Sequence, residues 1–147
     1  MEIRAVIDTN IWVSALLNPH GFPARLRQSF ENGLFEAVIS EPLLLELAAV
    51  LSRPRIKDKY NIASTDIEEL LVLIEERADH VILSGDIAVC RDTNDNFVIE
   101  TAIKGAAPHI VTRDDDIKFD RSVAVFLSAH GISVSSVARF LSLLQKR

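Results

Sequence analysis

Short apolar runs alternate with amphipathic stretches along this chain, which is the pattern of an α/β protein. The runs are short and rich in β-branched residues, without clear alternation, as strands of a parallel sheet covered on both faces are. They are predicted as strands at residues 3–7, 35–39, 80–83, 109–112 and 132–134. Helices are predicted at residues 10–17, 22–32, 41–51, 65–78, 96–104 and 136–145. This order predicts one domain, residues 1–147, with three α/β/α layers and a mostly parallel sheet of about five strands.

Capping residues mark several of these helix boundaries. Ser40 is predicted to cap the helix at 41–51. Thr65 and Glu68 fit a capping box for the helix that follows. The segment 122–130 fits either a helix or a strand.

Composition places the chain among ordinary globular domains. Its 147 residues are 48% hydrophobic, which is enough for a core. No apolar run reaches the roughly 20 residues of a membrane span, and the first residues lack the basic and apolar regions of a signal peptide. A single cysteine, Cys90, excludes an intramolecular disulfide. We therefore expect a cytoplasmic protein that does not enter a membrane.

The net charge of −5 argues against a protein that holds nucleic acid by electrostatics alone. A metal bound among acidic residues would, however, reverse this charge locally. A small basic segment follows the helix at 41–51 and holds Arg53, Arg55, Lys57 and Lys59. It could contact a nucleic-acid backbone, or it could be a solvated helix end and loop.

Four carboxylates occupy places where an acidic metal site could be assembled. Asp8 and Asp114 each follow an apolar strand, and ligands of parallel sheets gather at the carboxyl ends of the strands. Glu46 is the one charged residue in the stretch 43–51, and Asp95 starts the sheet-facing stripe of its helix. Carboxylates gathered in a low dielectric repel one another and need a cation. Oxygen ligands of this kind suit Mg²⁺ or Mn²⁺.

Three of these acids have a plain structural alternative. Asp8 could merely cap the helix after its strand, and Asp114 could belong to a polar turn. Asp95 could cap its own helix, on which Glu100 is predicted to point away from the core. Asp92 is its nearest competitor for the site.

Glu46 is harder to explain structurally. Its predicted helix is apolar or small nearly all round, with Leu43, Leu47 and Val50 on the same side. An unpaired buried carboxylate is costly, so Glu46 needs a partner. That partner could be a metal, or an arginine such as Arg53 in a structural ion pair.

Four segments resemble the motifs of PIN-domain nucleases, in the family's order and across nearly the whole chain. Residues 6–11, VIDTNI, resemble the opening motif, in which a strand runs into Asp-Thr/Ser-Asn. Residues 40–47 and 95–102 resemble the second and third motifs. Residues 111–116, VTRDDD, resemble the fourth, Thr-x-Asp-x-Asp. The strongest resemblance is to the VapC-like toxins of bacterial and archaeal toxin–antitoxin pairs.

The resemblance implies a PIN fold and divalent-metal-dependent cleavage of RNA phosphodiester bonds, with Mg²⁺ or Mn²⁺ as cofactor. Asp8 and Asp95 would be the main metal ligands, and Glu46 and Asp114 would complete the acidic cluster. Three further residues would support them: Asn10 holding Asp8, Thr112 supporting Asp114, and Asp116 assisting. The resemblance also implies an antitoxin that blocks the acidic cleft, and a homodimer.

The expected mechanism is in-line attack on phosphorus by a metal-activated water, which leaves a 5′-phosphate and a 3′-hydroxyl. Attack by the RNA 2′-hydroxyl would instead favour a pair of His or Lys side chains. The four histidines are widely scattered in the sequence: His20, His80, His109 and His130.

Two other classes of function remain open. A haloacid-dehalogenase-like phosphatase would use Asp8 as its nucleophile. Position 10, however, is Asn where that class has Asp, and the candidate lysine, Lys104, is predicted on the outward face of its helix. A non-catalytic PIN-like scaffold would be expected to lose some of the four acids, and all are present.

Overall fold

Within residues 2–90, 92–113 and 121–146, which the computed structural model describes, five strands form one sheet. The strands are β1 (Arg4–Ile7), β2 (Glu36–Ser40), β3 (Asp79–Val81), β4 (His109–Val111) and β5 (Ser133–Ser135). The helices are α1 (Thr9–Leu17), α2 (Phe22–Glu31), α3 (Glu41–Leu51), α4 (Pro54–Lys57), α5 (Ser64–Arg77), α6 (Thr93–Lys104), α7 (Arg121–Ala129) and α8 (Val137–Gln145). Among the residues that the structure describes, none of the helices combines the length and the hydropathy of a membrane span.

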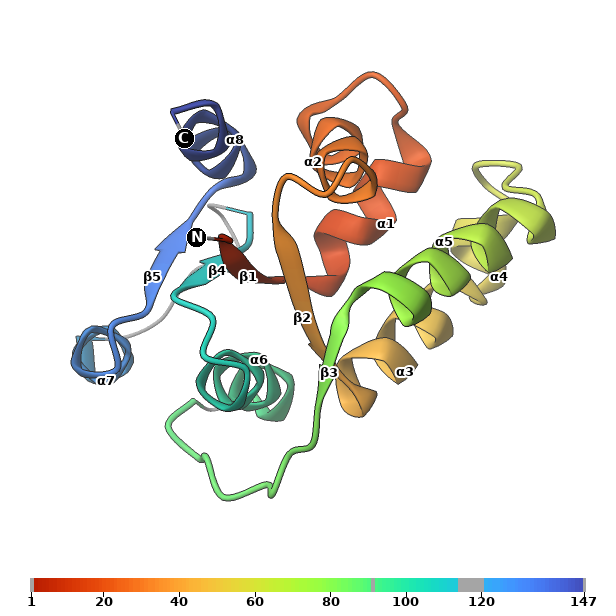
Figure 1. The fold of residues 1–147 in the computed structure, drawn as a ribbon. Helices are drawn as coiled ribbons and strands as arrows, with labels where there is room; N and C mark the ends of the chain where they lie inside the picture. Colours follow the sequence, from red (N-terminus) through yellow and green to blue (C-terminus); the bar gives the residue numbers. More distant parts are fainter. Residues whose placement is uncertain (1, 91, 114–120, 147) are drawn as a thin grey trace.

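Every strand pairs in parallel with its neighbours, in the order β3-β2-β1-β4-β5. Figure 1 shows α6 and α7 below the sheet and α1, α2 and α8 above it. The predicted α/β class and parallel sheet are therefore confirmed. Because helices cover both faces, the central strand β1 buries Ala5 and Val6 completely, and its sequence shows no alternation.

Arg4 ties the amino-terminal end of the sheet together, opposite the end that carries the motifs. Its guanidinium forms ion pairs with Glu36 at 3.0 Å and Asp79 at 2.6 Å, and donates to the Gly105 carbonyl. The hydrogen bond to Asp79 is the main reason why the pKa of Arg4 is raised. Gly105 lets α6 approach β2 closely, since a Cβ there would collide with the side chain of Val38.

Several predicted boundaries shift in the structure. The segment 122–130, left open between helix and strand, is the helix α7. The capping box at residues 65–68 is wrong, because α5 already begins at Ser64 and no side chain caps it. The fully buried side chains of Leu70 and Ile74, on the core face of α5, stabilise this helix instead.

Ser40 stands at the N-cap position of α3, as predicted, but its hydroxyl does not cap the helix. It lies 2.8 Å from the hydroxyl of Thr101 on α6, in a fully buried contact. The side chain therefore joins two elements of the core, which is a tertiary role that local sequence does not reveal.

The prediction that Glu100 points away from the core is wrong. Its side chain is 1% exposed, because the connection between β3 and α6 folds back over the helix. The carboxylate accepts hydrogen bonds from Ser84 N at 2.6 Å, Ser84 Oγ at 3.1 Å and Gly85 N at 3.0 Å. Gly85 has a φ of +81°, a conformation that glycine adopts without strain. Glu100 thus anchors the loop that leads to the start of α6.

Candidate active site at the carboxyl end of the sheet

The register of two strands places Asp8 beside Thr112. β1 and β4 pair Ile7 with Val111, and the ladder continues as Asp8 N donates to Val111 O at 2.9 Å. The Thr112 hydroxyl then donates to Asp8 Oδ2 at 2.7 Å. Asp8 occupies the N-cap position of α1, yet its side chain forms no cap hydrogen bond. The capping alternative therefore does not account for this carboxylate.

Glu46 lies half-buried on α3. The expectation that this helix is buried nearly all round is wrong. The helix is not apolar and buried all round, since Leu45 is 60% exposed. Glu46 accepts from Thr9 Oγ1 and from Asn94 Nδ2, each at 3.4 Å, which is the outer limit for a hydrogen bond. The part of the chain that the structure describes shows no ion pair on Glu46, and Arg53 is exposed.

The third group of polar residues comes from the start of α6. This helix begins at Thr93, earlier than the predicted residue 96, because Asp92 caps it: Asp92 Oδ1 accepts from Asn94 N at 2.9 Å. Asp95 is consequently the third residue of the helix and not the residue that precedes it. It lines the same pocket as Asp92.

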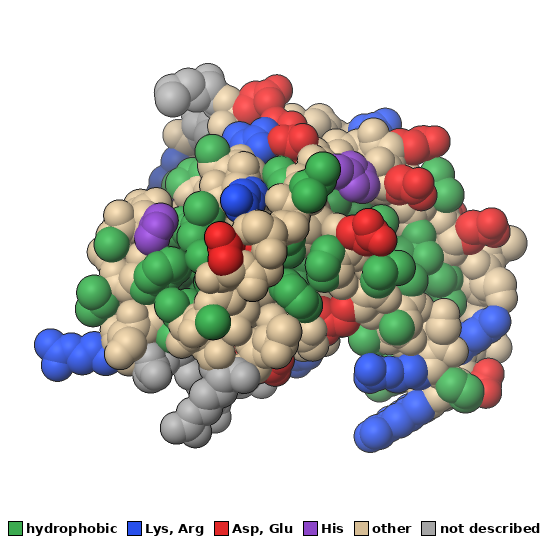
Figure 2. Space-filling view, turned by 90° about the horizontal axis from the view of Figure 1, so that it is seen from below, with side chains coloured by type: hydrophobic (Ala, Val, Ile, Leu, Met, Phe, Trp, Pro, Cys, Tyr) green, Lys and Arg blue, Asp and Glu red, His purple; other side chains and the backbone are tan. Residues whose placement is uncertain are grey.

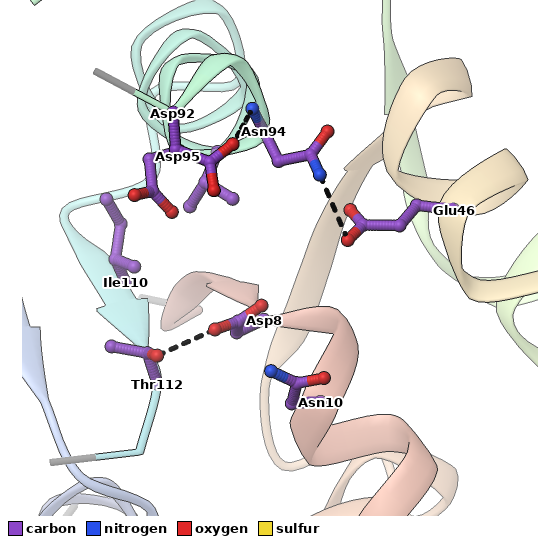
Figure 3. A pocket seen from close by; sticks show the side chains of 9 residues that line it. Asp8, Asn10, Glu46, Asp92, Asn94, Asp95, Ile110 and Thr112 are labelled. Carbon is purple, nitrogen blue, oxygen red and sulfur yellow. Dashed lines mark hydrogen bonds between the residues drawn. The ribbon is translucent and has the colours of Figure 1, made fainter. Parts of the chain in front are cut away.

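These three groups enclose one pocket of about 240 Å³. Its polar lining is Asp8, Asn10, Glu46, Asp92, Asn94, Asp95 and Thr112, above an apolar floor of Val98 and Ile110. Figure 3 shows the four carboxylates around a shared central space. The pocket is smaller than the roughly 300–1,000 Å³ of typical small-molecule sites, and it suits a hydrated ion and a phosphate group better than a bulky cofactor.

The structure thus brings together three of the four predicted acids, Asp8, Glu46 and Asp95. Asp114 and Asp116 lie outside the described residues. Thr112 was predicted to support Asp114, and its hydroxyl is seen on Asp8. Asn10 lines the pocket from the first turn of α1, as a residue near Asp8 should.

The charges in the pocket are unbalanced toward negative. Burial is the first cause that raises the pKa of Glu46, and the negative charge of Asp8 is the second. Asp92 and Asp95 raise it further, while the Thr9 hydroxyl opposes the shift. A carboxylate whose pKa is raised by its neighbours indicates a place where a cation would be bound favourably.

The donor atoms fit a hard divalent cation, because carboxylate and amide oxygens are the ligands of Mg²⁺ and Mn²⁺. Among the described residues, however, the structure shows no group of three or more His, Cys, Asp or Glu side chains that could hold a metal ion. The predicted metal centre therefore stays a prediction, based on the donor set and the charge.

Two residues that contact Glu46 were missed as contributors to the site: Asn94, which lines the pocket, and Thr9, which is buried. Thr9 stands between Asp8 and Asn10, and Asn94 lies between Asp92 and Asp95, so both are close in sequence to candidate site residues. Their contacts with Glu46 cross 37 and 48 residues of sequence, and only the fold reveals such contacts.

The residues that a rival chemistry would need are elsewhere. None of the four histidines is among the residues that line the pocket. Lys104 ends α6, roughly 16 Å along the helix from its first residue at 1.5 Å per residue. Lys104 therefore lies at the opposite end of α6 from Asp92 and Asp95 and does not line the pocket, which disfavours a phosphatase centre at Asp8.

The comparisons with known proteins agree with this geometry. The family model of the PIN domain matches residues 4–116, which include every residue of the pocket. The uncharacterized protein MJ1680 of Methanocaldococcus jannaschii is 28% identical over 132 residues, which cover 90% of this chain and 84% of the relative. The chain belongs to the PIN-domain family, whose members are generally nucleases.

Proposed function

We propose that this protein is a divalent-metal-dependent ribonuclease that hydrolyses RNA phosphodiester bonds in the acidic pocket. One observation carries the proposal: Asp8, Glu46 and Asp95 come from three separate elements and line one polar pocket at the carboxyl end of a parallel sheet. The family supports nuclease chemistry. The choice of RNA and of a metal cofactor rests on the motif resemblance and on the oxygen donors.

In this proposal Asp8 and Asp95 hold Mg²⁺ or Mn²⁺, and Glu46 and Asp114 complete the acidic cluster. When bound, the metal supplies neutralising charge for the phosphate and lowers the pKa of a water molecule. Thr112 fixes one oxygen of Asp8, so the other oxygen keeps its direction toward the pocket.

Further polar residues, in the pocket and outside its lining, orient these acids in the proposal. Thr9 and Asn94 each contact one oxygen of Glu46 and hold that carboxylate on the pocket side of α3. Asn10 stands next to Asp8 in the lining, from where its amide would help to hold that carboxylate, and Asp116 would assist from the fourth motif.

The test is cleavage of an end-labelled RNA pool by the purified protein with Mg²⁺, with Mn²⁺ and with EDTA. We expect cutting that requires the metal and leaves 5′-phosphate and 3′-hydroxyl ends. Cutting that persists in EDTA, or cyclic phosphate ends, would contradict the mechanism. No cutting with either metal would favour the scaffold alternative.

We further propose that the protein is the toxin of a toxin–antitoxin pair and forms a homodimer. This step rests on the VapC-like motif resemblance. Its test is growth arrest when the protein is expressed alone, relieved by co-expression of a neighbouring small protein that purifies with it. Unimpaired growth with an active nuclease would identify a solitary ribonuclease instead.

A further inference from the structure

We infer that the segment 53–60 binds the backbone of single-stranded RNA substrate beside the acidic pocket; this inference rests on the proposed ribonuclease function. We call this segment the basic arm. It consists of α4 with the residues on either side of it, and its side chains of interest are Arg53, Arg55, Lys57, Lys59 and Tyr60.

The cations of the basic arm are available to a ligand. Arg53, Arg55 and Lys59 are exposed, and Lys57 is partly exposed. Among residues 2–90, 92–113 and 121–146, the ion pairs engage other basic residues and none engages the arm. No seven-residue stretch elsewhere in the sequence holds more than two Lys or Arg, whereas residues 53–59 hold four and a single acid.

The arm is positioned by the same helix that carries Glu46. Arg53 follows α3 after its C-cap residue, Ser52, and lies seven residues beyond Glu46 in sequence. The last residue of the helix, Leu51, lies roughly 8 Å along the axis from Glu46 at 1.5 Å per residue. Figure 2 shows Lys and Arg side chains projecting from the lower right edge of the molecule, the side on which Figure 1 places α4. A strand of a few nucleotides can therefore reach from the pocket to the arm.

Charge explains why such an arm is needed. The whole chain carries −5, and the pocket gathers Asp8, Glu46, Asp92 and Asp95. An approaching polyanion meets repulsion there unless cations elsewhere attract its phosphates. The basic arm is the densest group of cations in the sequence, and it lies at the end of a helix that lines the pocket.

Tyr60 favours a single strand over a duplex. Its side chain is 47% exposed, and Lys59 Nζ lies 5.5 Å from the centroid of its ring. An exposed aromatic ring beside a cation is the combination that stacks an unpaired base while binding its phosphate. The next residue, Asn61, has a φ of +51°, so the chain turns sharply after the ring.

The test compares two variants that each remove two positive charges. Arg55→Gln with Lys59→Gln changes the basic arm. Arg139→Gln with Lys146→Gln changes exposed cations on and just after α8, on the opposite side of the molecule in Figure 1. Both are made in the wild-type protein and in Asp8→Asn. The probe is a labelled, unstructured RNA of about 20 nucleotides, longer than the roughly 4–16 that one small domain covers.

Two readouts are expected to separate the arm from the control. In the Asp8→Asn background, binding measured by anisotropy weakens about tenfold for the arm variant, and the salt slope falls by about 0.7 for each phosphate that the arm no longer neutralises. In the active protein KM rises by a similar factor while kcat stays close to the original value. The α8 variant keeps both values.

A third variant, Tyr60→Leu, tests the stacking. It should weaken binding of the single-stranded probe, while its effect on a duplex of the same sequence stays small. A stronger effect on the duplex would overturn the single-strand assignment and make a duplex the partner of the arm.

The outcomes distinguish the two levels of the proposal. Equal losses for the arm and α8 variants, or an unchanged salt slope for the arm variant, would overturn the inference while the nuclease stands. A wild-type protein that neither binds nor cuts the RNA would overturn the proposed function itself, and the inference with it.

Discussion

A hydrogen bond from Thr112 helps to set the direction of the Asp8 carboxylate, on which the proposed site depends. Thr112 is 5% exposed, and its hydroxyl holds Asp8 from the neighbouring strand. Outer residues that orient a metal ligand in this way commonly contribute about 10- to 100-fold to metal affinity or activity. The contact exists because β1 and β4 pair in parallel with Ile7 opposite Val111.

Thr112→Val should lower metal-dependent RNA cleavage by about 10- to 100-fold, because Asp8 loses the donor that orients it. The buried valine fills the same space, so the protein should remain folded by circular dichroism. Thr112→Ser keeps the hydroxyl and should retain most of the activity. Wild-type cleavage in the valine variant would show that the hydrogen bond has no role in the site.

Glu46 gives a pH-dependent prediction. Burial and the charge of Asp8 raise the pKa of Glu46 in the folded protein above its ordinary value of 4.5. At a pH between the ordinary pKa and the raised pKa, the folded protein therefore binds more protons than the unfolded chain. The stability of the metal-free protein should therefore fall as pH rises through the folded pKa.

The measurement is urea unfolding of wild-type protein and Glu46→Gln in EDTA across pH. Near pH 7 the variant should be the more stable, by less than about 1 kcal/mol because solvent screens a partly exposed group. The difference should vanish below the ordinary pKa, where both side chains are neutral. A variant that is less stable near pH 7 would contradict the repulsion in the pocket.

At the residue scale, sequence found the acids and missed their partners. Asp8, Glu46 and Asp95 stood out because each breaks an apolar pattern, and the fold places all three on one pocket. The contacts of Thr9 and Asn94 could not be predicted, because they depend on how α1, α3 and α6 pack.

At the scale of elements, Glu100 shows how one side chain can hold a loop. Its carboxylate accepts three hydrogen bonds from Ser84 and Gly85 while being almost completely buried. That contact anchors the connection from β3 to α6 on the helix whose first turn carries Asp95 and whose N-cap is Asp92.

Glu100→Ala should lower the free energy of unfolding by about 1–3 kcal/mol, the usual effect of removing the acceptor of buried hydrogen bonds. Lys104→Ala, an exposed change at the end of the same helix, should stay within about 0.5 kcal/mol. Urea unfolding compares the two. Equal stabilities would mean that the loop holds its place without Glu100.

Most elements were predictable because the chain repeats one simple unit, an apolar strand followed by a helix. Helix periodicity misplaced Glu100, since an isolated helix wheel cannot show that a loop covers its polar side. The start of α6 was placed late because Asp92 caps a first turn, residues 93–96, that contains no apolar residue. A tertiary contact determines the orientation of Glu100, and local capping by Asp92 determines where α6 begins.

At the scale of the whole molecule, a bound metal should couple the pocket to global stability. Mn²⁺ that binds the folded protein alone adds about 2.7 kcal/mol at 100 times its Kd. Thermal unfolding should therefore shift upward with Mn²⁺ in the wild-type protein and much less in Asp8→Asn. An identical shift in both proteins would place the metal away from this pocket.

The most direct measurement of the central claim is single-turnover RNA cleavage by three proteins in saturating Mg²⁺: wild type, Asp8→Asn and Asp66→Asn. The last removes the same charge from an exposed position on α5. We predict that Asp8→Asn loses cleavage by roughly 100-fold or more, as loss of a group that stabilises the transition state does, while Asp66→Asn matches the wild type. Full metal-dependent cleavage by a folded Asp8→Asn protein would contradict the assignment of the pocket as the catalytic centre.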